Sequence, residues 1–357
     1  MRNTSRVKRF ICLRTYSNPR SRAARAIVGL CISALLGNLM TNTPAGAAGH
    51  PAATYVNPVI DRDFPDPCIL DDGSYYYAYA TNGQGGILPC AKSPDLVHWT
   101  ALPDAMPKLA PWVKPGRTWA PDVSAIRRGK KYLLYFTAHD RAANTQAIGV
   151  ATSNSPEGPF VSDATQPFIS QPDLGGCIDP FGFVDDDQTR YIVWKNDGNS
   201  RGQDTWIWIQ KTSDDGLMRV GEPTKLIKQD QHWEGPLVEA PTLLRYDGKY
   251  YLFYSANGYG GCEYAMGYAV SDSLLGPYTK PRTVAWQAST GVVCGPGGQD
   301  IVTDSKGKMW MAYHSWGKGP HSYRSMSIDP LIWNGDIPYL LGPSKWEQTA
   351  PPVKKHR

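Results

Sequence analysis

The sequence predicts an all-β chain folded as a five-bladed β-propeller, and three observations support this. An aromatic-rich strand pattern of seven residues occurs five times, with starts 57 to 59 residues apart. Each copy follows a short turn rich in Gly, Asp or Lys, and apolar runs bounded by turn residues are typical of buried strands. No segment shows a convincing amphipathic helix, and the 30 prolines and 35 glycines suit many tight turns. A long fixed period favours a propeller, one blade per repeat, over a β-sandwich.

The five predicted central strands follow one another along the chain. They are YYYAYAT from Tyr75, YLLYFTA from Tyr132, YIVWKND from Tyr191, YYLFYSA from Tyr250 and MWMAYHS from Met309. Before four of them lies a segment that we expect to form the innermost strand of the blade: FPDPCIL, WAPDVSAI, IDPFGFV and EAPTLLR. After four of them comes a strand, a Ser/Asp/Pro turn and a further strand start. Each repeat therefore predicts about four strands.

The N-terminal segment differs in composition from the repeats. Residues 1–47 contain eight Lys or Arg and no Asp or Glu, and the apolar run 26–40 ends near the small residues Ala45, Gly46 and Ala47. This order predicts a secretory signal peptide at 1–47, followed by a single propeller catalytic domain at 48–357. The apolar run of 15 residues is short for a membrane span of about 20. An uncleaved membrane anchor is therefore the less favoured alternative.

Charge and cysteine content narrow the choice of partners and compartment. Without the leader, 29 Lys or Arg stand against 32 Asp or Glu, a net charge of −3, so no basic surface suggests nucleic acid. Export makes disulfides possible. Five cysteines remain after the leader, and the odd number leaves at least one outside any disulfide within the chain. The spacing does not assign the pairs, and Cys262–Cys294 is one candidate.

Four acidic residues occur in the predicted innermost strands: Asp66, Asp122, Asp179 and Glu239. The first strand of each blade lines the central axis, so carboxylates from different blades are expected to meet in one axial pocket. Glycoside hydrolysis needs two carboxyl groups on opposite faces of a sugar, and a third can tune the pKa of a neighbour. The alternative is that Asp-Pro pairs merely start turns. Four acids at one place in successive repeats favour function.

The motifs resemble glycoside hydrolase family 43. NPVIDRDFPDP, TWAPDVSAI, CIDPFGFVDDDQTRYIVW, VEAPTLLRYDGKYYLFYSA and MWMAYHSW…RSMSIDPLIW carry the resemblance, which spans about residues 55 to 340. It implies a five-bladed propeller that acts on arabinose- or xylose-containing plant polysaccharides with inversion. Matched residue by residue, it implies that Asp66 is the general base, Glu239 the general acid, and Asp179 the residue that orients the acid and modulates its pKa.

The resemblance also suggests roles for residues around the three acids. Trp119 resembles a wall on which a sugar stacks, although packing between blades is an equal alternative. Arg324 resembles an arginine that reaches a sugar hydroxyl, and its alternative is a surface salt bridge. Asp122 has no catalytic counterpart, so we expect a structural or substrate-orienting role. Glu234 is a rival to Glu239, but it lies 16 residues before Tyr250, out of register with the other acids.

His314 in AYHSW matches a histidine that, in many members of the family, faces the central channel beside a hydrated calcium ion. The chemistry needs no cofactor, so calcium would be structural. Gly298 stands where many relatives carry a second histidine, a departure that leaves the calcium open. Within DRDFPDPC, Asp61 and Asp63 are expected in the entrance loop. Pro67 is expected to hold Asp66 in extended backbone.

The predicted function is that of a secreted, inverting glycoside hydrolase directed at pentoses. An α-L-arabinofuranosidase or arabinanase is favoured, because the chain ends soon after the fifth blade without the C-terminal sandwich of many β-xylosidases. A β-xylosidase is the alternative within the family, and a retaining fructosidase of a related propeller is a second enzyme alternative. A non-catalytic glycan-binding propeller is the alternative of another class, and it would not need all three acids.

Overall fold

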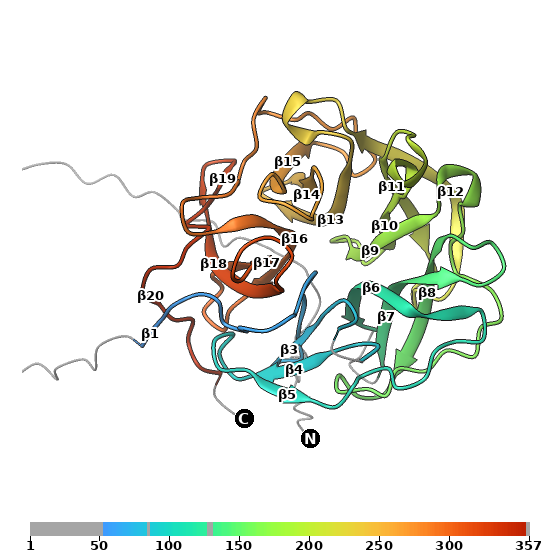
Figure 1. Ribbon diagram of the computed structural model, residues 1–357, viewed down its shortest axis with the longest axis horizontal. Helices are drawn as coiled ribbons and strands as arrows, with labels where there is room; N and C mark the ends of the chain where they lie inside the picture. The colour runs from blue at the N-terminus through green and yellow to red at the C-terminus, as the bar shows by residue number, and fades with distance from the viewer. Residues whose placement is uncertain (1–52, 84–85, 127–130, 355–357) are drawn as a thin grey trace, which may run out of the picture.

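The computed structural model describes residues 53–83, 86–126 and 131–354, so the predicted signal peptide lies outside the described residues. These residues form five small antiparallel sheets around one axis, which confirms the five-bladed propeller (Figure 1). The described part contains no α-helix, only three 3₁₀ turns, at Pro172–Leu174, Gly198–Arg201 and His232–Glu234. No helix within the described ranges has the length and apolar character needed to cross a membrane.

Within each blade the strands follow chain order from the axis outward. The four strands of blade 1 are β2 (Cys68–Asp71), β3 (Tyr76–Tyr79), β4 (Cys90–Ser93) and β5 (Thr100–Leu102). Blade 2 has β6 (Val113–Ala125), β7 (Tyr132–Asp140) and β8 (Gln146–Ser153). Blade 3 has β9 (Cys177–Val184), β10 (Arg190–Asn196), β11 (Trp206–Thr212) and β12 (Arg219–Lys228). Blade 4 has β13 (Val238–Tyr246), β14 (Lys249–Ala256) and β15 (Ala265–Ser271). Blade 5 has β16 (Cys294–Thr303), β17 (Met309–Trp316), β18 (Arg324–Asn334) and β19 (Ile337–Leu340).

The five predicted central strands are the second strands of the five sheets, β3, β7, β10, β14 and β17. Blades 1, 3 and 5 have the predicted four strands. In blades 2 and 4 the fourth strand is reduced to isolated bridges. These are Ile148 with Ile169 and Thr152 with Val161 in blade 2, and Met266 with Gln287 and Val270 with Thr279 in blade 4. The period of the repeat therefore predicts the central strands well and the outermost strands less well.

The core lies between the blades. Five hydrophobic clusters each combine residues of two neighbouring blades. Successive side chains of a strand point to opposite faces, so Leu133 and Tyr135 of β7 join the cluster with blade 3, whereas Leu134 and Phe136 join the cluster with blade 1. Both faces of a central strand are thus buried, which explains why these strands read as continuous apolar runs.

Both ends of the described chain close the ring. β1 (Thr54–Tyr55) pairs with β20 (Gln348–Thr349), and blades 1 and 5, blue and red in Figure 1, are neighbours. Asn57 and Ile328 of β18 exchange two hydrogen bonds, of 2.8 and 3.0 Å. The cysteine pair Cys262–Cys294 is confirmed: it joins the loop after β14 to the first residue of β16. The other described cysteines are buried and lie outside this disulfide.

Candidate active site

At matching positions, the innermost part of every blade carries a residue with positive φ. In four of the five ladders the register shifts at this residue, which marks a β-bulge. Bulges re-aim side chains and are frequent beside active sites. In four blades the residue precedes a proline. The five residues and their φ values are Asp66 (52°), Ala120 (39°), Asp179 (56°), Ala240 (50°) and Gly298 (58°).

The expectation that Pro67 holds Asp66 in extended backbone was wrong, because a φ of 52° lies in the left-handed region, which is uncommon outside glycine. The blade before each bulge supplies a hydrogen-bond acceptor that binds its backbone N–H. The pairs are Ala120 N to Thr81 Oγ1 (2.8 Å), Asp179 N to Thr137 Oγ1 (3.0 Å), Ala240 N to Asp179 Oδ2 (2.9 Å), Gly298 N to Ser255 Oγ (2.9 Å) and Asp66 N to His314 Nδ1 (3.1 Å). The preceding blade thereby holds each bulge.

Asp66 lies among groups that stabilise its negative charge. Thr81 Oγ1 donates to Asp66 Oδ2 at 2.6 Å, and Arg324 Nη1 lies 3.4 Å from Asp66 Oδ1. Burial alone would raise the pKa of this carboxyl. Arg324 and the hydrogen bond from Thr81 outweigh burial and hold the pKa of Asp66 well below its usual range. The carboxylate is therefore ionised at neutral pH and can accept a proton from water.

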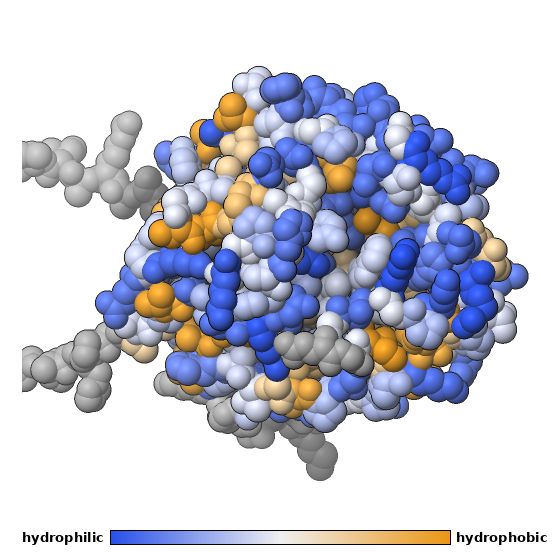
Figure 2. Space-filling model, in the orientation of Figure 1, coloured by the Kyte–Doolittle hydropathy of each residue, from blue (hydrophilic) through white to orange (hydrophobic). Residues whose placement is uncertain are grey.

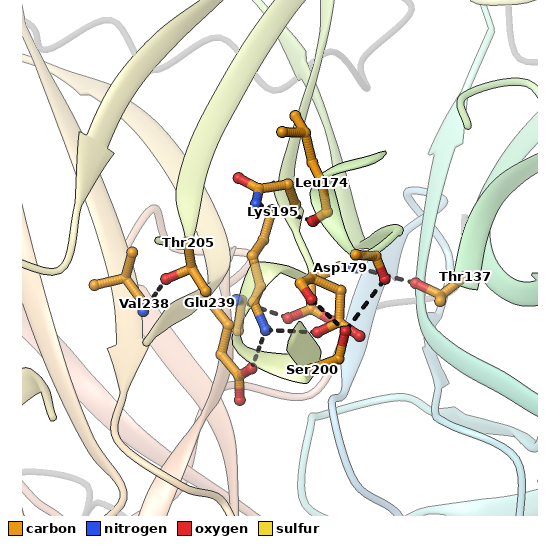
Figure 3. A network of polar contacts seen from close by, with 12 residues as sticks. Thr137, Leu174, Asp179, Lys195, Ser200, Thr205, Val238 and Glu239 are labelled. Atoms are coloured by element: carbon orange, nitrogen blue, oxygen red, sulfur yellow. Dashed lines mark hydrogen bonds and ion pairs between the residues drawn. The ribbon is translucent and has the colours of Figure 1, made fainter. Parts of the chain in front are cut away.

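Glu239 stands at the start of β13, where it meets a buried lysine. Lys195 Nζ of β10 lies 3.1 Å from Glu239 Oε2, and Tyr264 OH donates to Glu239 Oε1 at 2.8 Å. The same ammonium lies 3.1 Å from Asp197 Oδ1. Lys195 is 1% exposed, and Figure 3 shows its side chain reaching Glu239 across the boundary between blades 3 and 4. Both oxygens of Glu239 are thus held in place.

Asp179 carries the opposite electrostatics to Asp66. Burial and the nearby Glu239 carboxylate raise the pKa of Asp179 well above its usual value, and Lys195 only partly offsets this. Its Oδ2 accepts the backbone N–H of Ala240, the residue after Glu239. Asp179 therefore fixes the backbone that carries Glu239 and tends to hold a proton beside it. The structure brings the predicted acid and its predicted modulator together in one network.

Asp122 and Asp300 occupy the same position in blades 2 and 5, two residues after the bulge. Asp122 Oδ2 accepts the backbone N–H of Gly182 at 3.0 Å, and Asp300 Oδ2 accepts that of Ile69 at 2.7 Å. Each carboxylate thus bonds the innermost strand of the next blade. This supports the structural role that we considered for Asp122, and the substrate-orienting role stays a prediction.

The bulges surround a small axial cavity of about 40 Å³. A cavity of this size has room for water. Its lining is one set of three consecutive residues from every blade: Asp66–Cys68, Ala120–Asp122, Asp179–Phe181, Ala240–Thr242 and Gly298–Asp300. Acidic residues of four blades therefore line the axis: Asp66, Asp122, Asp179 and Asp300. Glu239, which the repeat also placed there, lies one residue before the bulge at Ala240 and is not part of this lining.

Residues of the entrance loop and of blades 4 and 5 surround Arg324, the cation beside Asp66. Asp63 Oδ1 accepts the backbone N–H of Arg324 at 3.2 Å, and Asp61 Oδ1 accepts Tyr323 OH at 2.6 Å. The two entrance-loop aspartates thus hold the segment that positions Arg324. The guanidinium of Arg324 also lies 4.8 Å from the centre of the Tyr259 ring. Arg324 is part of the Asp66 environment, so the surface salt-bridge alternative is not needed.

Trp119 is half-buried in β6, directly before the bulge at Ala120. Its predicted stacking role stays a prediction. Glu234, the rival acid, lies elsewhere: it is fully buried, accepts Tyr254 OH at 2.6 Å, pairs with Lys280 at 2.7 Å and caps its own 3₁₀ turn. Its carboxylate is committed to local structure, which supports the choice of Glu239.

His314 is buried beside Asp66, and burial together with Arg324 lowers its pKa, so the imidazole is neutral. Its Nε2 is buried without a hydrogen-bond partner among the described residues. Calcium prefers six to eight oxygen ligands, and the described residues hold no group of three His, Cys, Asp or Glu that could bind a metal. These residues do not fit an ion caged by protein side chains, and no step of the mechanism depends on one.

The surroundings of Gly298 explain in part why this chain lacks the second histidine that many members of the family carry at this position. A Cβ at this position would lie 2.6 Å from His314 Nδ1 and 2.7 Å from Asp66 Oδ1. A second histidine therefore has no room here unless the Asp66 environment moves. The glycine instead lets the backbone approach the carboxylate closely.

The sequence reasoning missed Lys195, Tyr264 and Thr81. The signal for Lys195 was a charged residue inside YIVWKND, a strand that is otherwise apolar and buried. Buried lysines are rare unless they are paired, so this lysine predicts a carboxylate partner. Tyr264 and Thr81 gave no such signal, because tyrosine and threonine are common in strands.

Comparisons with known proteins identify the family of the chain. The model of the family described as glycosyl hydrolases family 43 matches residues 55–338. A beta-D-galactofuranosidase of Aspergillus niger is 27% identical over 297 residues, 78% of this chain and 79% of that protein. An arabinoxylan arabinofuranohydrolase of Bacillus subtilis is 28% identical over 335 residues, 78% of this chain and 62% of that protein. The solved structure of a thermostable family-43 glycoside hydrolase has a TM-score of 0.76 at 29% identity, over 84% of this chain and 99% of that one. The chain belongs to glycosyl hydrolase family 43 and is a glycoside hydrolase.

Proposed function

We propose that the protein hydrolyses glycosidic bonds of arabinose or xylose units in plant polysaccharides or oligosaccharides with inversion of configuration. The observation that carries this proposal is the contrast between two carboxyl environments. Asp66 is held ionised by Arg324 and Thr81, whereas Asp179 and Glu239 form a buried pair in which the pKa of Asp179 is raised. Single-displacement hydrolysis needs an ionised base and an acid side that holds a proton, and a buried carboxyl pair that shares one proton supplies the acid side.

In the proposed mechanism, Asp66 takes a proton from a water molecule while the water oxygen bonds to the anomeric carbon. The bond from that carbon to the glycosidic oxygen breaks, and Glu239 gives its proton to the leaving oxygen. Water is consumed, and the new hydroxyl lies on the opposite face of the sugar. Asp179 supports this step by holding the backbone N–H of Ala240 and by favouring a proton on the acid side of the site.

Arabinofuranosides are the favoured substrates. The Bacillus subtilis relative is an arabinoxylan arabinofuranohydrolase and the Aspergillus niger relative a beta-D-galactofuranosidase, so both names refer to sugars in the furanose form. Neither relative exceeds 28% identity, so the choice between arabinose and xylose rests on experiment. We also propose secretion, because the leader has the order of a signal peptide and the Cys262–Cys294 disulfide suits an oxidising compartment.

The first test is a panel of aryl α-L-arabinofuranoside, β-D-xyloside and β-D-galactofuranoside, with debranched arabinan and arabinoxylan. We expect the arabinofuranoside to be cleaved fastest. Proton NMR during the first minutes should show release of the inverted anomer, and release of the retained anomer would rule out the mechanism and favour the retaining alternative. Asp66→Asn should lower kcat by at least 10³-fold, the scale of losing a catalytic group.

The glycan-binding alternative has its own outcome in this experiment. If the protein binds arabinan or arabinoxylan, cleaves no member of the panel, and binds equally well as Asp66→Asn, it is a binding module. Asp215→Asn is a matched control, because Asp215 bonds only neighbouring turn residues among its described contacts. This variant should leave both cleavage and binding unchanged.

A further inference from the structure

The loop after β14, residues 257–264, places an exposed aromatic ring next to the site. Tyr259 is 53% exposed, and the guanidinium of Arg324 lies 4.8 Å from its ring centre. The same guanidinium lies 3.4 Å from Asp66 Oδ1. The ring is therefore one guanidinium group away from the carboxylate that we assign as the base. The pairing with Arg324 also holds the ring in one orientation.

The loop is fastened on several sides. The backbone carbonyl of Tyr259 accepts Trp316 Nε1–H of β17 at 3.0 Å, and Cys262 is bonded to Cys294 of β16. Gly295 approaches so closely that a Cβ there would lie 2.6 Å from the Gly261 carbonyl oxygen. Blade 5 thus fixes a loop that belongs to blade 4. An exposed ring that is fixed in advance loses little conformational freedom when a ligand covers it.

The same loop ends on the acid side of the site. Tyr264, which closes it, donates to Glu239 Oε1 at 2.8 Å. One short segment therefore contacts both halves of the catalytic machinery, the base side through Tyr259 and Arg324 and the acid side through Tyr264.

We propose that Tyr259 forms a stacking platform for a second pentose unit of the substrate, adjacent to the unit that is cleaved. The C–H face of a sugar ring packs on an aromatic face, and exposed tyrosines at a site suit ligands with one apolar and one polar side. This inference rests on the proposed function for the class of ligand. The inference goes beyond the proposed function, because it makes Tyr259 a determinant of the preference for oligomeric over single-unit substrates.

The other two exposed aromatic side chains of the described chain lie away from the site. Tyr339 is 44% exposed in β19, the outermost strand of blade 5, and Trp346 is 56% exposed in the segment before β20. Tyr339→Ala is therefore a matched control: it removes a similarly exposed tyrosine ring without touching the site.

The experiment compares Tyr259→Ala, Tyr259→Phe and Tyr339→Ala on arabinotriose or xylotriose, whichever the wild type cleaves, and on the methyl pentoside, which has one sugar unit. Tyr259→Ala should raise KM for the trisaccharide about tenfold, which is the scale of one lost stacking contact. The same variant should change kcat/KM for the methyl pentoside less than twofold. Tyr259→Phe and Tyr339→Ala should resemble the wild type on both substrates.

An equal effect of Tyr259→Ala on both substrates, or none on the trisaccharide, would overturn the platform. Melting temperatures equal to that of the wild type exclude unfolding as the cause of a higher KM. If Tyr259→Ala is unstable, Tyr259→Phe keeps the test valid, because this variant retains the ring and must retain full affinity for the trisaccharide. Calorimetric titration of the trisaccharide separates the two proposals. If nothing is cleaved but binding still depends on Tyr259, only the proposed function fails; if cleavage proceeds and Tyr259 is neutral, only the platform fails.

Discussion

Arg324 and Lys195 are cations that contact different carboxylates of the site. Arg324 lies 3.4 Å from Asp66, and Lys195 lies 3.1 Å from both Glu239 and Asp197. On the base side one cation, Arg324, acts together with hydrogen bonds to the same carboxylate, and the pKa of Asp66 falls. On the acid side one ammonium faces three carboxyl groups, and the pKa of Asp179 still rises. The number of cations per carboxylate decides which side holds a proton.

We predict that Lys195→Met moves the alkaline limb of the pH profile of kcat/KM to higher pH. The ammonium now opposes the rise in the pKa of Asp179, so its loss lets the acid side hold its proton to higher pH. A shift of about one unit corresponds to 1.4 kcal/mol of lost interaction. The measurement is kcat/KM of an aryl arabinofuranoside across pH, with Lys195→Arg as the variant that keeps the charge.

Lys195→Met also leaves Asp197 and Glu239 without their cation, which typically costs about 3 to 5 kcal/mol. Profiles are therefore recorded well below the melting temperature of each variant. Lys228→Met is the matched control, because it removes an exposed pair with Asp204. An unchanged alkaline limb in folded Lys195→Met would mean that the lysine has only a structural role.

The sequence predicted the acids better than their partners. Asp66, Asp179 and Glu239 could be found because a repeat with carboxylates at its inner end has few structural explanations. Lys195 lies in a strand whose pattern indicates burial, and burial does not say which residue faces it across the blade boundary. Tyr264 approaches Glu239 only because the loop after β14 folds back, and strand periodicity carries no information on loops.

At the scale of the element, the innermost part of every blade has a positive-φ residue before a proline or, in blade 5, at Gly298, and in blades 2 to 5 this residue lies in a bulge. The sequence showed the X-Pro pairs but suggested extended backbone, because the rule for residues before proline describes their average behaviour. The bonds from the preceding blade override that preference. Positive-φ residues at one level of five neighbouring blades surround the axial cavity, and Asp66 and Asp179 are two of them.

We predict that Asp122→Ala destabilises the fold by about 1 to 3 kcal/mol, because the buried N–H of Gly182 loses its acceptor. Asp122→Asn retains a carbonyl oxygen and should be milder. Asp300→Ala, at the same position in blade 5, should resemble Asp122→Ala, since it leaves the N–H of Ile69 unpaired by that carboxylate. Urea unfolding measures all three.

The asparagine variant also tests the substrate-orienting alternative for Asp122. A role in packing alone predicts that Asp122→Asn keeps kcat and KM within about twofold. A role in substrate binding predicts a clear rise in KM in a variant that is still stable. Steady-state kinetics on the favoured arabinofuranoside decides between the two.

At the scale of the whole molecule, the ring depends on its closure. The five-fold period predicts five blades, and the central strands emerge at the predicted places. The closure could not be predicted in the same way, because the segments that make it are short and have no copy elsewhere in the chain: β1 and β20 have two residues each. Near them lies Asp329 of β18, which is fully buried and accepts Ser344 Oγ, Gln348 Nε2 and Tyr313 OH, each at 2.6 Å. Asn57, two residues after β1, donates to the same carboxylate at 3.3 Å, so Asp329 binds both ends of the described chain.

We predict that Asp329→Ala lowers the melting temperature by about 6 to 10 °C, or roughly 3 kcal/mol, because the buried donors of both chain ends lose one shared acceptor. Asp336→Ala is the control: its exposed carboxylate lies in the next hairpin turn, 3.7 Å from Lys249, and an exposed pair is worth under about 1 kcal/mol. Calorimetry should show one cooperative transition for both variants, shifted only in Asp329→Ala. If the ring closes mainly through the hydrophobic cluster that blades 1 and 5 share, the two variants will have the same melting temperature. The hydrogen bonds of Asp329 then contribute little to the stability of the fold.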